Sequence, residues 1–333
     1  MPLPDAFNGP AKNLLPYTRP AGLARDILPL PVYDTPEIHG FESTIEEAIF
    51  ILSQSETARK FAATAMAADY VIVIADDENK NLRGYVDHEQ RLIFLAKEQD
   101  PRLLALTLGH ELAHVSQKVN GGIEIDTRLD HPQDAIRKLL AMEADARAHE
   151  ILIATELSFA DQKDKAPRAS FSEIFNMAAE KSENPLVTGL LRNIEGKLQT
   201  GDVAPHKLLA ACFKSFYGET SFRRTYENVV VRKLAQYDAE TFQAPENFQR
   251  RIDADTLTRK IDAHSTAYLA PNKEHVDLNA PVYHALSSET QIFLQAAQKI
   301  RFENPALTQE ALWQAPTFAD LAKNIPQKKG PSA

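Results

Sequence analysis

The residues whose types and spacing could do chemistry lie together in His110-Glu111-Leu112-Ala113-His114. On a helix, residues four positions apart lie on one face, so the two histidines could bind a single metal ion. Glu111 lies between them and could accept a proton from a water molecule bound to that metal. Two helical histidines with an intervening glutamate therefore predict hydrolysis by a metal-activated water.

The surrounding sequence predicts the helix that this motif needs. Asp100 is a favourable N-cap, and Pro101 suits the first helical position, where its missing N–H is not required. Gly121-Gly122 predicts the end of the helix. Apolar residues recur between these limits at helical spacing and predict a buried face: Leu104, Leu108, Leu112 and Val115.

Hydrophobic segments before this helix predict β-structure. Residues 70–75 are a β-branched run of strand length. Residues 83–87 and 91–95 flank a polar turn and predict a hairpin. An edge strand beside the metal helix could hold an extended peptide by main-chain hydrogen bonds.

A zinc site that works in catalysis needs a third protein ligand and one open position. A second long helix is predicted to begin near Pro132 and to run past Leu152. If this helix returns antiparallel to the first, it could bring Glu143 to the metal. Five other residues compete for this role, namely Glu150, Glu124, Asp126, Asp130 and His131.

The two motifs together resemble a known class of zinc peptidases. Gln117 and Asn120 stand where metzincins carry glycine and histidine, which excludes that class. A downstream helical Glu-Ala-Asp-x-x-Ala beginning at residue 143 is instead similar to gluzincin-type peptidases. The ImmA/IrrE-like proteases and related bacterial metallopeptidase families have the nearest pattern, and the resemblance covers residues 70–155.

The resemblance implies a role for each matching residue. His110 and His114 correspond to the two histidine ligands of zinc, Glu111 to the general base and Glu143 to the third ligand. The thermolysin pattern carries a histidine-supporting aspartate four residues after the ligand glutamate, where this chain has Arg147.

For other residues the sequence predicts only a general position or a shared candidate role. Asp145 is expected to turn to the far side of its helix, away from Glu143. His149 is predicted to be an ordinary surface histidine. The isolated histidines are predicted to be surface or core residues: His39, His206, His264, His275 and His284. Tyr217, Tyr226 and His206 are candidates for stabilising the oxyanion of a tetrahedral intermediate.

Composition limits the class of protein. The chain has 333 residues, 44% of them hydrophobic, and a net charge of −9 with acidic and basic residues interspersed. This charge disfavours nucleic-acid and anionic-membrane partners. Cys212 lies in an apolar segment and is predicted to be a buried, inert thiol. Without a signal peptide or a membrane-length apolar stretch, a cytoplasmic protein is expected, with leaderless export as an alternative.

The remaining sequence suggests three parts. Residues 1–42 carry eight of the 20 prolines and predict an extended segment that either wraps the domain or occludes the cleft. Residues 43–160 are predicted to form an α+β zincin-like lobe, with a small mixed sheet, the motif helix and the Glu143 helix. A helix over residues 44–67 would open this lobe and pack across the sheet.

Residues 161–333 are predicted to form a mainly helical C-terminal lobe. Amphipathic patterns predict its helices at residues 170–181, 185–200, 206–217, 226–237 and 288–302.

These patterns predict a zinc-dependent peptidase acting on a protein or peptide substrate. Two alternatives remain: a regulatory or binding protein that keeps the metallopeptidase fold without turnover, and a zinc hydrolase that does not cleave peptides. Retention of Glu111 argues against the first, because a binding protein needs no general base. The sequence does not determine the oligomeric state.

Overall fold

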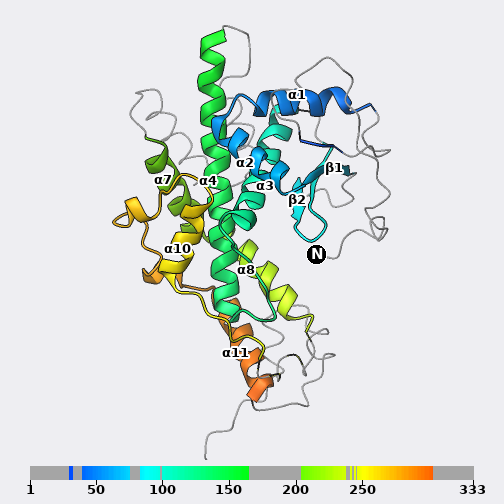
Figure 1. Cartoon of the computed structure of the whole chain (residues 1–333). Helices are drawn as coiled ribbons and strands as arrows, with labels where there is room; N and C mark the ends of the chain where they lie inside the picture. Colours follow the sequence, from blue (N-terminus) through cyan, green and yellow to red (C-terminus); the bar gives the residue numbers. More distant parts are fainter. Residues whose placement is uncertain are drawn as a thin grey trace, which may run out of the picture.

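The structure is a computed structural model, and it describes residues 30–32, 40–75, 83–97, 100–164, 204–237, 241, 244 and 246–302. Within these residues it is mixed α and β, mostly helical with one three-stranded sheet. Figure 1 shows α4 running through the length of the molecule, with α3 and the sheet on one side and α7 and α10 on the other.

Two helices open the described core. They are α1 (Glu42–Leu52) and α2 (Glu56–Ala67), and both pack against α3. The prediction of one continuous helix over residues 44–67 is therefore wrong. The helix is interrupted because Ser55 is extended and caps α2, accepting a hydrogen bond from Ala58 N while donating one to Glu156 Oε2.

The sheet consists of β1 (Val71–Ala75), β2 (Gly84–Asp87) and β3 (Leu92–Ala96) in the order β1-β3-β2. The predicted hairpin and the preceding strand are confirmed. β3 pairs parallel to β1 and antiparallel to β2. On the far side of β1, Val32 forms a parallel bridge to Ile72. Within the described residues, β2 is consequently the edge strand that pairs on one side only.

Side-chain alternation gives the sheet two buried faces. Ile72 and Ile93 lie on the face that joins the main hydrophobic core, together with Ile74 and Leu95. On the opposite face Phe94 packs in a smaller cluster and stacks on Tyr85, with ring centroids 4.5 Å apart.

The motif helix, α3 (Pro101–Val119), forms as its sequence predicts. The Asp100 side chain accepts a hydrogen bond from Arg102 N, and Pro101 occupies the first turn. The four predicted apolar residues are all buried: Leu104, Leu108, Leu112 and Val115. Gly122 has φ +58°, a left-handed conformation that only glycine adopts without strain, and lies just beyond the helix.

α4 (Pro132–Asp164) is the predicted second helix and packs against α3 and α7. The other helices of the described C-terminal part are α7 (Pro205–Gly218), α8 (Thr220–Leu234), α10 (Ala254–Ala263) and α11 (Ser288–Phe302), with short 3₁₀ turns η4 (Ala270–Asn272) and η5 (Pro281–Tyr283).

Three of these helices match predicted ones, whereas α10 was not predicted. α8 begins earlier than expected because Glu219 caps it, accepting a hydrogen bond from Phe222 N at 2.7 Å. The predicted helices at residues 170–181 and 185–200 lie outside the described residues, as does most of residues 1–42. The three-part division of the chain stays a prediction. No helix in the described part of the chain is long and apolar enough to span a bilayer.

Candidate metal centre

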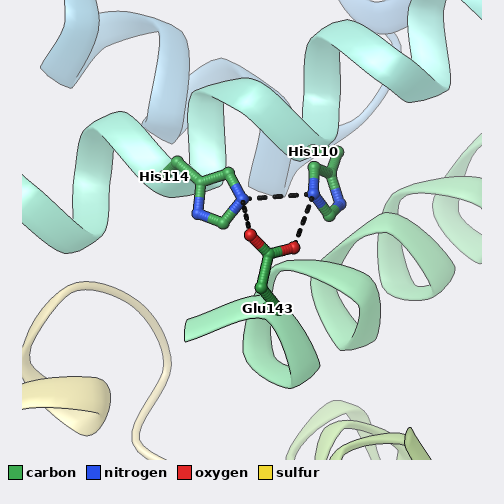
Figure 2. A group of neighbouring side chains, drawn as sticks. All are labelled: His110, His114 and Glu143. Atoms are coloured by element: carbon green, nitrogen blue, oxygen red, sulfur yellow. Dashed lines mark hydrogen bonds and ion pairs between the residues drawn. The ribbon is translucent and has the colours of Figure 1, made fainter. Parts of the chain in front are cut away.

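Packing of α3 against α4 brings the two motifs together. His110 and His114 project from α3 towards Glu143, which projects from α4 (Figure 2). The Nε2 atoms of the two histidines are 3.1 Å apart. Glu143 Oε2 lies 3.7 Å from His110 Nε2, and Glu143 Oε1 lies 3.5 Å from His114 Nε2.

These distances fit a tetrahedral metal ion. Bonds of about 2.0–2.1 Å at tetrahedral angles place neighbouring ligand atoms roughly 3.3 Å apart. Two imidazole nitrogens and a carboxylate oxygen form a donor set that zinc accepts. The three side chains could therefore hold a metal ion through one atom each.

The charges at the site also fit a cation. Burial alone would raise the pKa of Glu143, but the adjacent His114 and His110 rings outweigh it and hold this pKa well below its usual range. Burial would lower the pKa of His114, yet Glu143 raises it above its ordinary value. The site thus attracts positive charge, which a bound metal ion would supply in place of a proton.

Glu111 lies beside the two histidines and is only 5% exposed. Burial raises the pKa of its carboxyl, against the lowering effect of His110 and His114. A raised pKa suits a carboxylate that must accept and release a proton near neutral pH.

The edge strand β2 passes directly over Glu111. A Cβ atom added to Gly84 would lie 2.9 Å from Glu111 Oε1 and 3.0 Å from Thr107 Cγ2. Gly84 therefore allows the main chain of β2 to approach Glu111 more closely than any other residue would.

Glu150 lies beside His110 but not among the three side chains that converge on one point. Its Oε2 atom lies 3.3 Å from His110 Nδ1, the ring nitrogen that does not face Glu143. Arg147 pairs with the same oxygen at 2.6 Å. Burial would raise the pKa of Glu150, but Arg147 and His110 lower it to about 2. Glu150 thus places a carboxylate on the Nδ1 side of His110, whereas the thermolysin pattern carries its histidine-supporting aspartate at the position of Arg147.

The other four candidate ligands make contacts elsewhere in the structure. Glu124 pairs with Lys118 at 2.8 Å, and Asp130 pairs with Lys138 at 2.6 Å. Asp126 accepts hydrogen bonds from Arg128 N and Leu129 N. His131 precedes the first turn of α4, and its main-chain oxygen accepts from Asp134 N.

Of the three candidate oxyanion donors, Tyr226 lies at the metal centre. It lies near Glu143 and Arg147, and burial together with the Glu143 charge raises its pKa. The Tyr217 hydroxyl instead donates to Tyr283 O at 3.0 Å. His206 lies in the first turn of α7, and its main-chain oxygen accepts from Asn272 Nδ2.

A buried polar cluster behind His114 was not predicted from the sequence. Gln117 entered the sequence analysis only as the residue that excludes metzincins, but its Oε1 accepts from His114 Nδ1 at 2.8 Å. Asp145 is fully buried and hydrogen-bonded to Gln117.

The prediction of His149 as a surface residue is wrong, because it is fully buried with Nδ1 donating to Asp145 O. His264, expected on the surface or in the core, is in the core.

Some of these contacts had a signal in the sequence. Gln117 follows His114 by three residues, and His149 follows Asp145 by four, so each pair shares a helix face. The signal for His264 and Tyr268 was absent, because both lie more than a hundred positions from Asp145.

Comparison with known families agrees with a metal centre here. A family model described as "Putative metallopeptidase family (DUF6782)" matches residues 26–169, which include α3 and α4. This part of the chain is similar to metallopeptidases, which are hydrolases that use a metal ion. No curated protein and no solved structure matches the chain.

The geometry predicts that Glu143, and not Glu150, is the third ligand. We expect wild-type protein to bind one zinc ion per chain. Glu143→Ala should weaken zinc binding by more than the roughly 10- to 100-fold that loss of a ligand-orienting partner costs. Glu150→Ala, on the same helix face, should stay within that range. Competition with a chromogenic chelator measures both affinities, and a greater loss in Glu150→Ala would reverse the assignment.

Proposed function

We propose that this protein is a zinc-dependent peptidase of the gluzincin type, related to the ImmA/IrrE-like proteases. The observation that carries the proposal is the convergence of His110, His114 and Glu143 with a buried Glu111 beside them. The metallopeptidase match over residues 26–169 supports the same class. The sheet, α3 and α4 would then form the zincin-like lobe.

The chain's own residues would divide the reaction between them. A zinc ion held by His110, His114 and Glu143 would polarise the scissile carbonyl and lower the pKa of water at the site. Glu111 accepts the proton from the attacking water through its carboxylate. The same carboxyl then gives this proton to the leaving amine nitrogen, so that Glu111 returns to its starting state.

Within the described residues no strand pairs with the outer edge of β2, and this edge supports a peptide as substrate. Arg83 O accepts from Ala96 N at 2.8 Å, which places this pair in a hydrogen-bonded position of the antiparallel ladder. Because such positions alternate, the main-chain groups of Gly84 and Val86 point away from β3. An extended peptide could pair with these groups and would then run beside Glu111, against which Gly84 packs.

Tyr226 is the donor that we assign to the oxyanion. A tyrosine hydroxyl is protonated at neutral pH, and burial raises the pKa of Tyr226 further, so it can donate a hydrogen bond. It belongs to α8 and lies beside Glu143. A carbonyl oxygen that gains negative charge during attack would therefore meet both the cation and the Tyr226 O–H.

The two alternative functions differ from this proposal in defined ways. A binding protein with this fold would hold zinc but would not need a buried glutamate of raised pKa beside the ligands. A zinc hydrolase with another substrate would keep Glu111 but would have no use for the outer edge of β2, which is unpaired within the described part of the chain. The proposed substrate is accordingly a protein or peptide segment in extended conformation, and the proposed location is the cytoplasm.

Glu111→Gln should separate metal binding from turnover. The amide keeps the size of the side chain but cannot accept the water proton, so peptide cleavage should fall by about 10²- to 10⁴-fold with zinc content unchanged. Mass spectrometry of a mixed peptide pool, with and without chelator, measures the cleavage. The exposed His275→Ala serves as a control that should match wild type. Undiminished cleavage by Glu111→Gln would exclude this mechanism.

Tyr226→Phe should slow the chemical step without removing the metal. Loss of one oxyanion donor lowers kcat by about 10²-fold or more, while KM and zinc affinity should change little. Tyr217→Phe removes another buried tyrosine hydroxyl and provides the matched control, because that hydroxyl is bonded to Tyr283 O. If both variants lose activity equally, Tyr226 has no special part in the reaction.

A further inference from the structure

A chain of buried hydrogen bonds leads from His114 away from the metal centre. His114 Nδ1 donates to Gln117 Oε1 at 2.8 Å, and Gln117 Nε2 donates to Asp145 Oδ2 at 2.5 Å. Gln117 Nε2 also donates to Met142 O at 2.8 Å. Because both partners of Nε2 can only accept, the amide has one orientation, and its oxygen must face His114.

The far end of this chain comes from the segment that follows α10. His264 Nε2 donates to Asp145 Oδ2 at 2.6 Å, and the Tyr268 hydroxyl donates to Asp145 Oδ1 at 2.7 Å. Asp145 and Tyr268 are fully buried, and His264 is 4% exposed. The carboxylate thus receives strong hydrogen bonds on both oxygens in surroundings without competing solvent.

The segment itself is firmly attached. Ser116 Oγ donates to His264 O at 2.9 Å, which fixes the segment to α3. The Asp262 carboxylate accepts from three successive main-chain N–H groups, those of residues 268–270. His264 and Tyr268 are therefore held in place independently of their bonds to Asp145.

Asp145, His149 and His264 are better arranged for hydrogen bonding than for binding a second metal ion. Asp145, His149 and His264 lie close enough together to be considered as ligands. However, Asp145 Oδ2 and His264 Nε2 are 2.6 Å apart, whereas two ligand atoms of one zinc ion are roughly 3.3 Å apart. His149 Nδ1 donates to Asp145 O at 2.9 Å, so only Nε2 of this ring keeps a lone pair.

We propose that Gln117, Asp145, His264 and Tyr268 form a relay of positioning residues that orients His114 for metal binding. The inference rests on the proposed function, because it takes His114 as a metal ligand. Donation from Nδ1 leaves the lone pair of His114 on Nε2, the atom that faces His110 and Glu143. The carboxylate behind the amide strengthens the bond to Nδ1 and makes the imidazole a better donor to a cation.

The relay makes the metal centre depend on distant sequence. The residues matched by the metallopeptidase family end at 169, before His264 and Tyr268. Without these two donors, the buried Asp145 carboxylate would keep only Gln117 and His149, whose Nδ1 lies 3.2 Å from Oδ1. The C-terminal segment is accordingly part of the metal centre.

Zinc affinity and a spectroscopic signal test the relay without any substrate. Gln117→Leu breaks the link at His114 and should weaken zinc binding by about 10- to 100-fold. The nearly isosteric Tyr268→Phe keeps the fold and should weaken it several-fold. In zinc-loaded protein labelled with ¹⁵N-histidine, the His114 Nδ1 proton should give a protected resonance that is lost in Gln117→Leu and shifted in Tyr268→Phe.

Tyr217→Phe is the matched control, because it removes a buried tyrosine hydroxyl bond outside the relay. Its zinc affinity and His114 resonance should equal those of wild type, even where its free energy of unfolding falls as much as that of Tyr268→Phe. Wild-type affinity in both relay variants, or equal losses in the control, would overturn the relay.

The outcomes separate the relay from the proposed function. If wild-type protein binds zinc and the relay variants bind it more weakly, but no peptide is cleaved, the relay stands and the peptidase proposal fails. If peptides are cleaved and the relay variants keep wild-type affinity, the peptidase proposal stands and the relay fails. A wild-type protein that binds no zinc contradicts both.

Discussion

The contact between the Glu143 carboxylate and two imidazole rings constrains the rest of the structure. A carboxylate in a largely buried place is unfavourable unless opposite charge or donors compensate it. Here the compensation comes from His110 and His114 on another helix, so α3 and α4 can pack in few ways. The hydrophobic stripe of α3 and the long apolar contacts of α4 satisfy this requirement, and the sheet then covers Glu111 through Gly84.

α4 carries two sets of polar residues on different faces. Glu143, Arg147 and Glu150 recur at helical spacing and surround the metal position. Asp145 and His149 lie on another face and join the C-terminal segment. In the proposed function, one helix would thus contribute a ligand, a carboxylate beside His110 and the centre of the support behind His114. The proposed relay would then make a chain segment beyond residue 160 part of the site.

Much of the fold was predictable where the signal is local. The cap at Asp100 and the leucine spacing of α3 specify that helix within its own sequence, as does the hairpin pattern for β2 and β3. The break before α2 was missed because Ser55 is stabilised partly by Glu156, which is remote in sequence. The relay was missed for the same reason: an aspartate reveals its donors only when helices from distant segments pack around it.

The central claim is that zinc binds between His110, His114 and Glu143. Anomalous diffraction at the zinc absorption edge, from crystals of the zinc-loaded protein, tests it most directly. The account predicts a strong peak within bonding distance of the two Nε2 atoms and the Glu143 carboxylate, about 2.0–2.2 Å from each. No peak at that position, or a single peak between Asp145, His149 and His264, would contradict it.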